Sequence, residues 1–244
     1  MKYDEYVSRK SWKAGEPLQH WISQRIVAEL VRITSIKSSQ TRVLEIGAGT
    51  GTLALEMNKL GFKSYTAFEP NSELARITKA RNPQNQIFEI ALPDVPVEFK
   101  DSFDLIICVH VIEHATNGYD AHEWIDSLRD LLTENGLLLI VSPQISDFKG
   151  YFWEIDWSHC FPTSVENLKQ ILADVNLEVL HSRIFKLGTT RSLGKVLGKF
   201  LDIVLPTRLL NLLGNRLVGR PLGTGLKAAL IWGVTFVVAT KRKI

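Results

Sequence analysis

The sequence predicts an α/β fold, in which a mostly parallel sheet carries helices on both of its faces. Short apolar runs alternate with stretches of helical periodicity, and this alternation is typical of parallel sheets. A glycine-rich turn follows the first apolar run, at residues 47–51. The chain has 244 residues, 45% of them hydrophobic, which is enough for one substantial core. We therefore expect a single domain over residues 1–244.

The first predicted element is a helix in the N-terminal segment, residues 1–40, where apolar side chains recur at nearly helical spacing. Strands are then predicted over residues 43–46, 64–68, 86–90, 105–109, 137–141, 176–184 and 235–240. Helices are predicted between them, over residues 53–60, 72–80, 121–132 and 165–173. Thr163 stands three positions before Glu166, a pattern that caps helix N-termini, so we expect the last of these helices to begin there.

Residues 189–225 interrupt this alternation before the last strand. Apolar residues from Leu193 to Leu205 recur at helical spacing and form one continuous stripe, which Pro206 should end. The leucines between positions 209 and 217 predict a second amphipathic piece. The apolar run at residues 228–240 is too short for a membrane span, which needs about 20 residues. The sequence therefore predicts an amphipathic helical insertion before the last strand.

The charges are unevenly distributed along the chain. The net charge is +3, but residues 183–244 carry +11 and residues 1–182 carry −8. A basic amphipathic insertion can be a lid over an acceptor pocket, and it can also touch an anionic membrane surface. Nucleic acid is not favoured as a partner, because the basic residues alternate with leucine rather than with aromatic residues that stack on bases.

Cysteine usage and the N-terminal sequence bear on the compartment. Cys108 and Cys160 have no spacing typical of a metal site, and we expect no disulfide between them. The first residues are polar and lack the apolar run of a signal peptide. We expect a cytoplasmic protein, with peripheral association at the inner face of the membrane as a further expectation.

A glycine-rich motif connects the first predicted strand to its helix. It reads Glu-x-Gly-x-Gly-x-Gly and starts at Glu45. The dinucleotide-binding fingerprint needs glycine where Thr52 stands, and the phosphate loop of nucleotide triphosphatases needs a Gly-Lys pair that this motif lacks. Glu69 closes the next strand, where a carboxylate can bind both hydroxyls of a ribose. The motif predicts a site for a nucleoside-containing cofactor.

These motifs resemble those of class I S-adenosylmethionine-dependent methyltransferases, and the resemblance covers residues 41–181. Besides the glycine motif, residues 103–108 resemble the family's fourth strand and residues 128–142 its fifth-strand unit. The resemblance implies a Rossmann-like three-layer sandwich with a seven-stranded sheet, and it implies S-adenosylmethionine as the cofactor.

The resemblance also implies which residues bind that cofactor. The glycine turn would pass beneath the methionine and the ribose, Glu69 would hold the ribose with help from Asn71, and Ala91 and Leu92 would lie along the adenine. Glu45 would reach the methionine ammonium group or hold the amides of the glycine turn. The full predicted set is Glu45, Gly47, Ala48, Gly49, Gly51, Glu69, Pro70, Asn71, Ala91, Leu92, Val109 and His110.

Three polar residues follow the fourth predicted strand: His110, Glu113 and His114. They would share one side of the backbone if it were helical there. In the ubiquinone-biosynthesis O-methyltransferases, which this stretch resembles, Glu-x-x-Glu-His at these positions is associated with a divalent metal. Here a histidine replaces the first glutamate. His110 and His114 are therefore candidates for a general base or for residues that order the loop, in preference to a metal site.

His159 lies between the fifth strand and the capped helix, in a segment that faces the acceptor in the family. It is our first candidate for a general base or an acceptor contact, and the alternative is a loop histidine with its hydrogen bonds satisfied. Tyr151, Trp153 and Trp157 either wall an apolar acceptor pocket or pack within the protein.

The expected function is methyl transfer from S-adenosylmethionine to a small-molecule or lipid-linked acceptor, at oxygen. One alternative is methylation of a modified tRNA base. Another is a catalytically silent methyltransferase-like domain that acts as a membrane-associated partner in a complex. The intact glycine turn and Glu69 argue against the silent domain.

Overall fold

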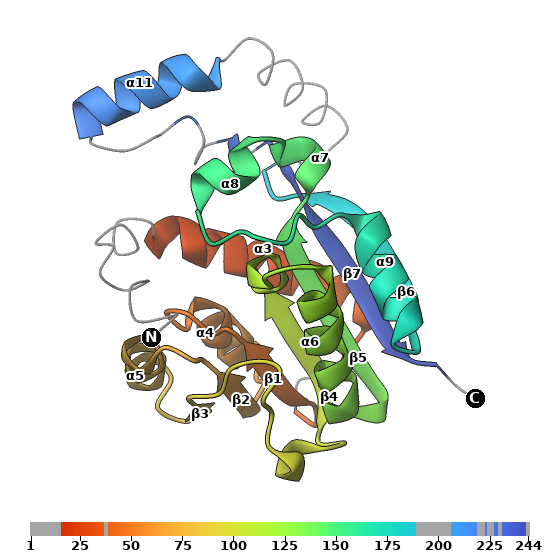
Figure 1. The fold of residues 1–244 in the computed structure, drawn as a ribbon. Coiled ribbons are helices and arrows are strands. Elements are labelled where there is room, and N and C mark those ends of the chain that lie inside the picture. Colours follow the sequence, from red (N-terminus) through yellow and green to blue (C-terminus); the bar gives the residue numbers. More distant parts are fainter. Residues whose placement is uncertain are drawn as a thin grey trace.

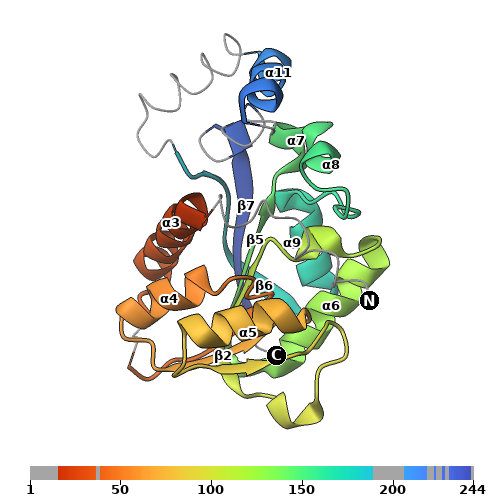
Figure 2. The same cartoon turned by 90° about the vertical axis from the view of Figure 1, so that its left-hand side faces the viewer.

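The computed structural model describes residues 16–36, 39–188, 206–218, 223, 227–228 and 231–242. Within them, a seven-stranded sheet lies between two layers of helices (Figures 1 and 2). The strands are β1 (Arg42–Ile46), β2 (Ser64–Phe68), β3 (Gln86–Phe88), β4 (Phe103–Val109), β5 (Leu132–Pro143), β6 (Leu177–Lys186) and β7 (Gly233–Lys241). The main helices are α3 (Glu16–Thr34), α4 (Thr52–Lys59), α5 (Ser72–Arg81), α6 (Gly118–Leu131), α9 (Val165–Asp174) and α11 (Thr207–Val218).

The strand order is β3-β2-β1-β4-β5-β7-β6. Neighbouring strands are parallel except that β7 runs antiparallel to both β5 and β6. The predicted fold class, a mostly parallel seven-stranded sheet between helices, is thereby confirmed. The chain moves outward from β1 to β3 and then returns to place β4 on the other side of β1. Ligands bind at such a reversal of strand order, beyond the carboxyl ends of the strands.

Two apolar cores cover the two faces of the sheet. Successive side chains of a strand point to opposite faces, so Leu44 of β1 packs in the core that contains α6 and α9. Its neighbour Val43 packs in the core that contains α3 and α4. A smaller cluster joins Phe148 of the short helix α7 (Ile145–Phe148) and Phe152 of α8 (Tyr151–Ile155) to Trp232, just before β7.

The cap of α9 lies one residue later than predicted. Ser164, not Thr163, is the N-cap, and its Oγ accepts a 3.1 Å hydrogen bond from the Asn167 amide. Thr163 is fully buried and donates through its hydroxyl to the Pro143 carbonyl at 2.6 Å. Because the end of β5 holds the threonine side chain, the next residue caps the helix, and the prediction of a Thr163–Glu166 capping box was wrong.

Part of the predicted insertion can be compared with the structure. Helix α11 forms where the second amphipathic piece was expected, between β6 and β7 in the chain. The first predicted piece, residues 193–205, lies outside the described residues. Among the helices that the structure describes, none is long and apolar enough to cross a membrane.

Candidate active site

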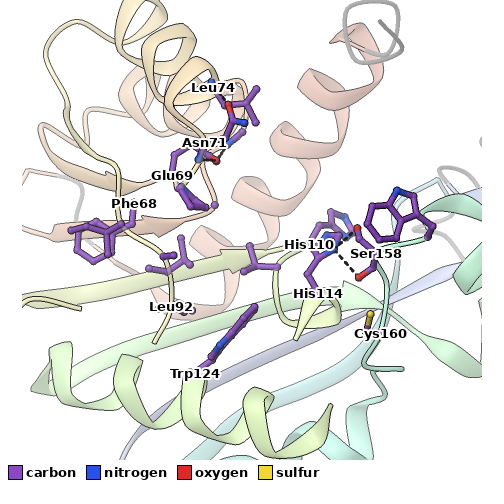
Figure 3. Close-up of a pocket in the computed structure, with 18 residues that line it drawn as sticks. Phe68, Glu69, Asn71, Leu74, Leu92, His110, His114, Trp124, Ser158 and Cys160 are labelled. Atoms are coloured by element: carbon purple, nitrogen blue, oxygen red, sulfur yellow. Dashed lines mark hydrogen bonds between the residues drawn. The ribbon is translucent and has the colours of Figure 1, made fainter. Parts of the chain in front are cut away.

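A pocket opens beyond the carboxyl ends of β1, β2 and β4 (Figure 3). The turns that follow these strands, together with the loop after β3, line its cofactor side. Eight of the residues predicted to bind a cofactor lie in its wall: Gly47, Gly49, Glu69, Pro70, Asn71, Ala91, Leu92 and His110. Phe68, Leu74 and Ile90 add apolar surface on the same side, which suits a flat base.

Glu69 ties the glycine turn to the end of β2. One carboxylate oxygen accepts a 2.7 Å hydrogen bond from the Gly49 amide, and the other accepts a 3.0 Å bond from the Asn71 amide. Burial raises the pKa of Glu69, and the two amide hydrogen bonds oppose that rise. Each carboxylate oxygen can accept a further bond, so the group can receive both hydroxyls of a ribose while it holds the turn.

The glycines of the turn have different surroundings. Gly51 has a φ of +73°, and a Cβ there would lie 2.6 Å from Nδ2 of Asn82 and 3.2 Å from Cα of Thr78. Gly49 has a φ of +55°, but a Cβ there would meet nothing within 4 Å, and this residue lines the pocket. Both positions disfavour a side chain because the backbone is left-handed, but only Gly51 is also packed.

We expect Gly51→Ala and Gly49→Ala to affect different properties. Left-handed backbone costs both variants about 1–2 kcal/mol of folding free energy. Gly51→Ala adds a clash with α5 and should lower the melting temperature further. Gly49→Ala should retain more stability, because the added methyl group meets no other atom. It should weaken S-adenosylmethionine binding, because Gly49 lines the pocket and the methyl group would occupy space there. Thermal melting and titration calorimetry measure the two effects. Equal melting temperatures would contradict this interpretation of the packing.

Four residues of the predicted cofactor set do not line the pocket: Glu45, Ala48, Gly51 and Val109. Glu45 is buried and accepts a 2.9 Å hydrogen bond from the Tyr65 hydroxyl. The hydrogen bond of its carboxylate is thus to Tyr65 and not to an amide of the glycine turn, and the predicted contact with the methionine ammonium group stays a prediction. The Gly49 amide goes to Glu69 instead.

The stability of the protein without cofactor should fall with rising pH because of Glu45. Burial raises the pKa of Glu45 from its ordinary 4.5 to about 8. A raised pKa favours the folded state at pH values below the unfolded pKa, and this contribution is lost as the pH rises through about 8. Glu45→Gln keeps an acceptor for Tyr65 and carries no charge. Its melting temperature should therefore exceed that of the wild type at about pH 9. An exposed control, Glu73→Gln, should leave the profile unchanged, and parallel profiles for Glu45→Gln and wild type would refute the assignment.

His110 stands directly after β4 in an unusual conformation. Its φ is +56°, a region that side chains rarely adopt. Its Nδ1 donates to Oε1 of the fully buried Glu113 at 3.2 Å, and the other Glu113 oxygen accepts a 2.8 Å bond from the Ser142 hydroxyl. Burial alone would raise the pKa of Glu113, but the His110 hydrogen bond and the nearby histidines lower it, to about 2.

The three residues after β4 do not share one side of a helix. Only a short 3₁₀ turn forms there (η2, Ile112–His114), and His110 lies before it. Among the described residues, the ligand atoms that all lie within 4.8 Å of one another belong to Glu113, His114 and His159, and His110 is not part of this group. Glu113 already has a hydrogen bond on each oxygen, so its burial needs no cation. The residues therefore do not fit the metal arrangement that the resemblance suggested.

His114 is held by a chain of hydrogen bonds. The Ser158 hydroxyl donates to Oδ1 of Asp156 at 2.6 Å, since a carboxylate only accepts. Nδ1 of His114 lies 3.0 Å from that hydroxyl oxygen and 3.3 Å from the Ser158 carbonyl, so Nδ1 carries the proton and donates to both (Figure 3). The remaining ring nitrogen, Nε2, keeps its lone pair, and His114 lines the pocket.

The end of the pocket away from Glu69 is partly apolar. His114, Ser158 and Cys160 lie there (Figure 3), and Trp124 and Trp157 are further lining residues of the pocket. Of the predicted aromatic wall, only Trp157 reaches the pocket. Tyr151 instead stacks on Trp232 with the ring centroids 5.3 Å apart, and Trp153 packs against Phe152.

His159, our first candidate for the base, does not line the pocket. It is buried, and its Nδ1 donates to the Phe152 carbonyl at 2.7 Å. Its ring meets that of His114 edge to face, 5.0 Å between centroids. Burial lowers the pKa of His159. The structure places it behind His114.

Sequence reasoning missed Ser158 and Asp156. A local signal was present, because Asp-x-Ser forms a turn in which the Ser158 amide also donates to Oδ1 of Asp156, at 2.9 Å. The partner of this turn, His114, lies far away in the sequence, and no pattern connects the two segments.

Comparison with known proteins identifies the family. The family model described as a methyltransferase domain matches residues 18–182, which is more than half of the chain. The chain belongs to this methyltransferase family. The match confirms the predicted enzyme class, an S-adenosylmethionine-dependent methyltransferase. The match also includes β1 to β4, the strands whose following segments line the cofactor side of the pocket.

Several relatives and solved structures resemble this methyltransferase. The ubiquinone biosynthesis O-methyltransferase of Rickettsia typhi is 25% identical over 212 residues, which cover 77% of this chain and 83% of the relative. A methyltransferase of Staphylococcus carnosus is 28% identical over 156 residues, covering 58% and 72%. The magnesium protoporphyrin IX methyltransferase of Synechocystis PCC 6803, solved with bound S-adenosylhomocysteine, matches with a TM-score of 0.59 and 12% identity, covering 92% and 83%. This last likeness concerns the fold.

Proposed function

We propose that this methyltransferase methylates a hydroxyl oxygen of an apolar, lipid-like small molecule, with His114 as the general base. The observation that carries the proposal is the Asp156–Ser158–His114 chain of hydrogen bonds. It fixes the neutral tautomer that can accept a proton on Nε2, at the apolar end of the pocket.

The reaction follows from this arrangement. The acceptor hydroxyl transfers its proton to Nε2 of His114 as its oxygen attacks the methyl carbon. S-adenosylmethionine, held by Glu69 and the glycine turn, would supply the activated methyl group and would leave as S-adenosylhomocysteine, so that the other product would be a methyl ether. A positioned base typically contributes 10²–10⁴-fold to the rate of such a step. The pocket wall supplies alignment of the reactants and exclusion of water.

The choice of acceptor rests on the residues around His114. Trp124 and Trp157 offer indole surface, and few charged groups stand at this end of the pocket. A hydrophobic acceptor gains free energy from covering that surface. The residues of the wall include no cluster of basic side chains that would favour a tRNA substrate.

Transfer of a labelled methyl group tests the proposal. The protein is incubated with methyl-labelled S-adenosylmethionine and a matched pair of long-chain acceptors, one with a phenolic hydroxyl and one with an amine. We expect label in the organic extract of the phenol reaction. Label only on the amine, or only on added tRNA, would contradict the proposal.

A further inference from the structure

Three leucines of helix α11 face outward, and Leu210 is half-buried. Leu209, Leu212 and Leu213 are 52%, 65% and 46% exposed. The small residues Thr207 and Gly214 are buried on the opposite side, where Gly223 lies close to Thr207. Globular proteins normally place the apolar face of a surface helix inward. This helix has the reverse orientation, which marks a surface that meets something other than water.

The same end of the molecule exposes tryptophan. Trp153 on α8 is 49% exposed, and Trp157 just after that helix is 65% exposed. Both views of the fold place α11 beyond α7 and α8, at the end of the sheet where β7 begins (Figures 1 and 2). Trp157 also lines the pocket. The exposed apolar residues therefore reach the edge of the site itself.

The charge of α11 favours an anionic occupant, while Glu154 and Asp156 lie between the two tryptophans. Helix α11 contains two arginines and no acidic residue, and no acidic residue follows Asp202 in the chain. Arg216 is exposed, on the same side of the helix as Leu209, Leu212 and Leu213. Leucine inserts among acyl chains, tryptophan prefers the level of the headgroups, and arginine pairs with lipid phosphates. Each basic residue near an anionic bilayer adds electrostatic attraction.

We propose that α11 and the two tryptophans form a membrane-docking face for anionic lipid, so that the pocket receives its acceptor from the bilayer. The face is defined by Leu209, Leu212, Leu213, Arg216, Trp153 and Trp157. The delivery of a lipid-like acceptor rests on the proposed function, whereas the docking itself does not. Docking on this face would place the mouth of the pocket next to Trp157 at the level of the lipid headgroups.

Sedimentation with lipid vesicles tests the docking face without cofactor or acceptor. The full chain is mixed with vesicles of phosphatidylcholine, alone or with about one third phosphatidylglycerol. We expect it to pellet with the anionic vesicles and much less with neutral vesicles or at high salt. The double variant Leu209→Ser/Leu212→Ser should bind at least about ten-fold more weakly.

Matched controls separate docking from general hydrophobicity and from misfolding. Leu60 is 49% exposed and Leu180 is 55% exposed, so they are as exposed as the leucines of α11. Leu60 lies at the C-terminal end of α4 and Leu180 lies on β6, outside the proposed docking face. Leu60→Ser/Leu180→Ser should pellet like the wild type, and circular dichroism should show both double variants folded. A wild type that stays in the supernatant would overturn the proposal, as would equal pelleting of the two double variants. The proposal would also be overturned if the protein did not pellet with vesicles and light scattering showed that it self-associates through the same leucines. Failure here leaves methyl transfer to a phenol intact, so the two proposals are tested separately.

Discussion

His114→Ala should lower the rate of methyl transfer to a phenolic acceptor by about 10²–10⁴-fold, while its affinity for S-adenosylmethionine stays close to that of the wild type. In the proposed reaction Nε2 of His114 accepts the acceptor's proton, whereas the ribose is expected to bind at Glu69 on another side of the pocket. Steady-state kinetics and titration calorimetry measure the two quantities.

Three further variants sharpen this test. Ser158→Ala should lower the rate less than His114→Ala, because the Ser158 carbonyl still accepts from Nδ1, and Ser158→Thr should restore part of the loss. His122→Ala, on α6 and outside the pocket wall, is the matched control and should behave like the wild type. A large loss in His110→Ala with an active His114→Ala would assign the base to His110 instead.

Glu69→Ala should weaken S-adenosylmethionine binding by about 100-fold. Hydrogen bonds to a charged group contribute about 1.5–3 kcal/mol each, so the loss of two ribose contacts costs at least about 3 kcal/mol. The variant also loses the acceptors for the Gly49 and Asn71 amides. It should therefore melt at a lower temperature than the wild type.

The conservative variant Glu69→Gln distinguishes the two effects. Its amide oxygen can still accept one backbone hydrogen bond, so it should recover part of the stability but little of the affinity. Glu73→Ala removes an exposed carboxylate on the next helix and serves as the control. Unchanged cofactor affinity in Glu69→Ala would show that Glu69 does not hold the ribose.

Eight of the twelve residues predicted to bind the cofactor line the pocket, because the determinants of that side are local. The glycine turn and Glu69 each follow a strand directly, and parallel neighbours bring the ends of β1 and β2 together. The predicted strand at residues 64–68 matches β2 in both bounds. Glu45 could not be placed in the same way. The direction of its side chain depends on Tyr65, a partner on another strand.

The acceptor side was predicted less well, because its geometry depends on contacts between loops. Helical spacing suggested that His110, Glu113 and His114 act together, but the left-handed backbone at His110 separates it from His114. His159 follows Ser158 directly, yet Ser158 turns toward His114 while His159 donates to the Phe152 carbonyl. Two adjacent residues of this loop therefore differ in position: Ser158 lines the pocket, and His159 does not.

The proposed membrane-docking face could be predicted from the sequence only in part. Helical periodicity predicted an amphipathic piece after Pro206, and α11 confirms the helix. Periodicity cannot tell whether an apolar stripe faces inward or outward. Burial of Gly214 and exposure of Leu212 decide that question in the structure.

We propose that Glu69 and the glycine turn together hold the ribose of the methyl donor. A crystal structure with S-adenosylhomocysteine would show whether they do. We predict nucleoside density in the pocket, with both ribose hydroxyls in hydrogen-bonding distance of the Glu69 carboxylate and the thioether sulfur facing His114. A nucleoside bound elsewhere, or a ribose that does not contact Glu69, would contradict the claim.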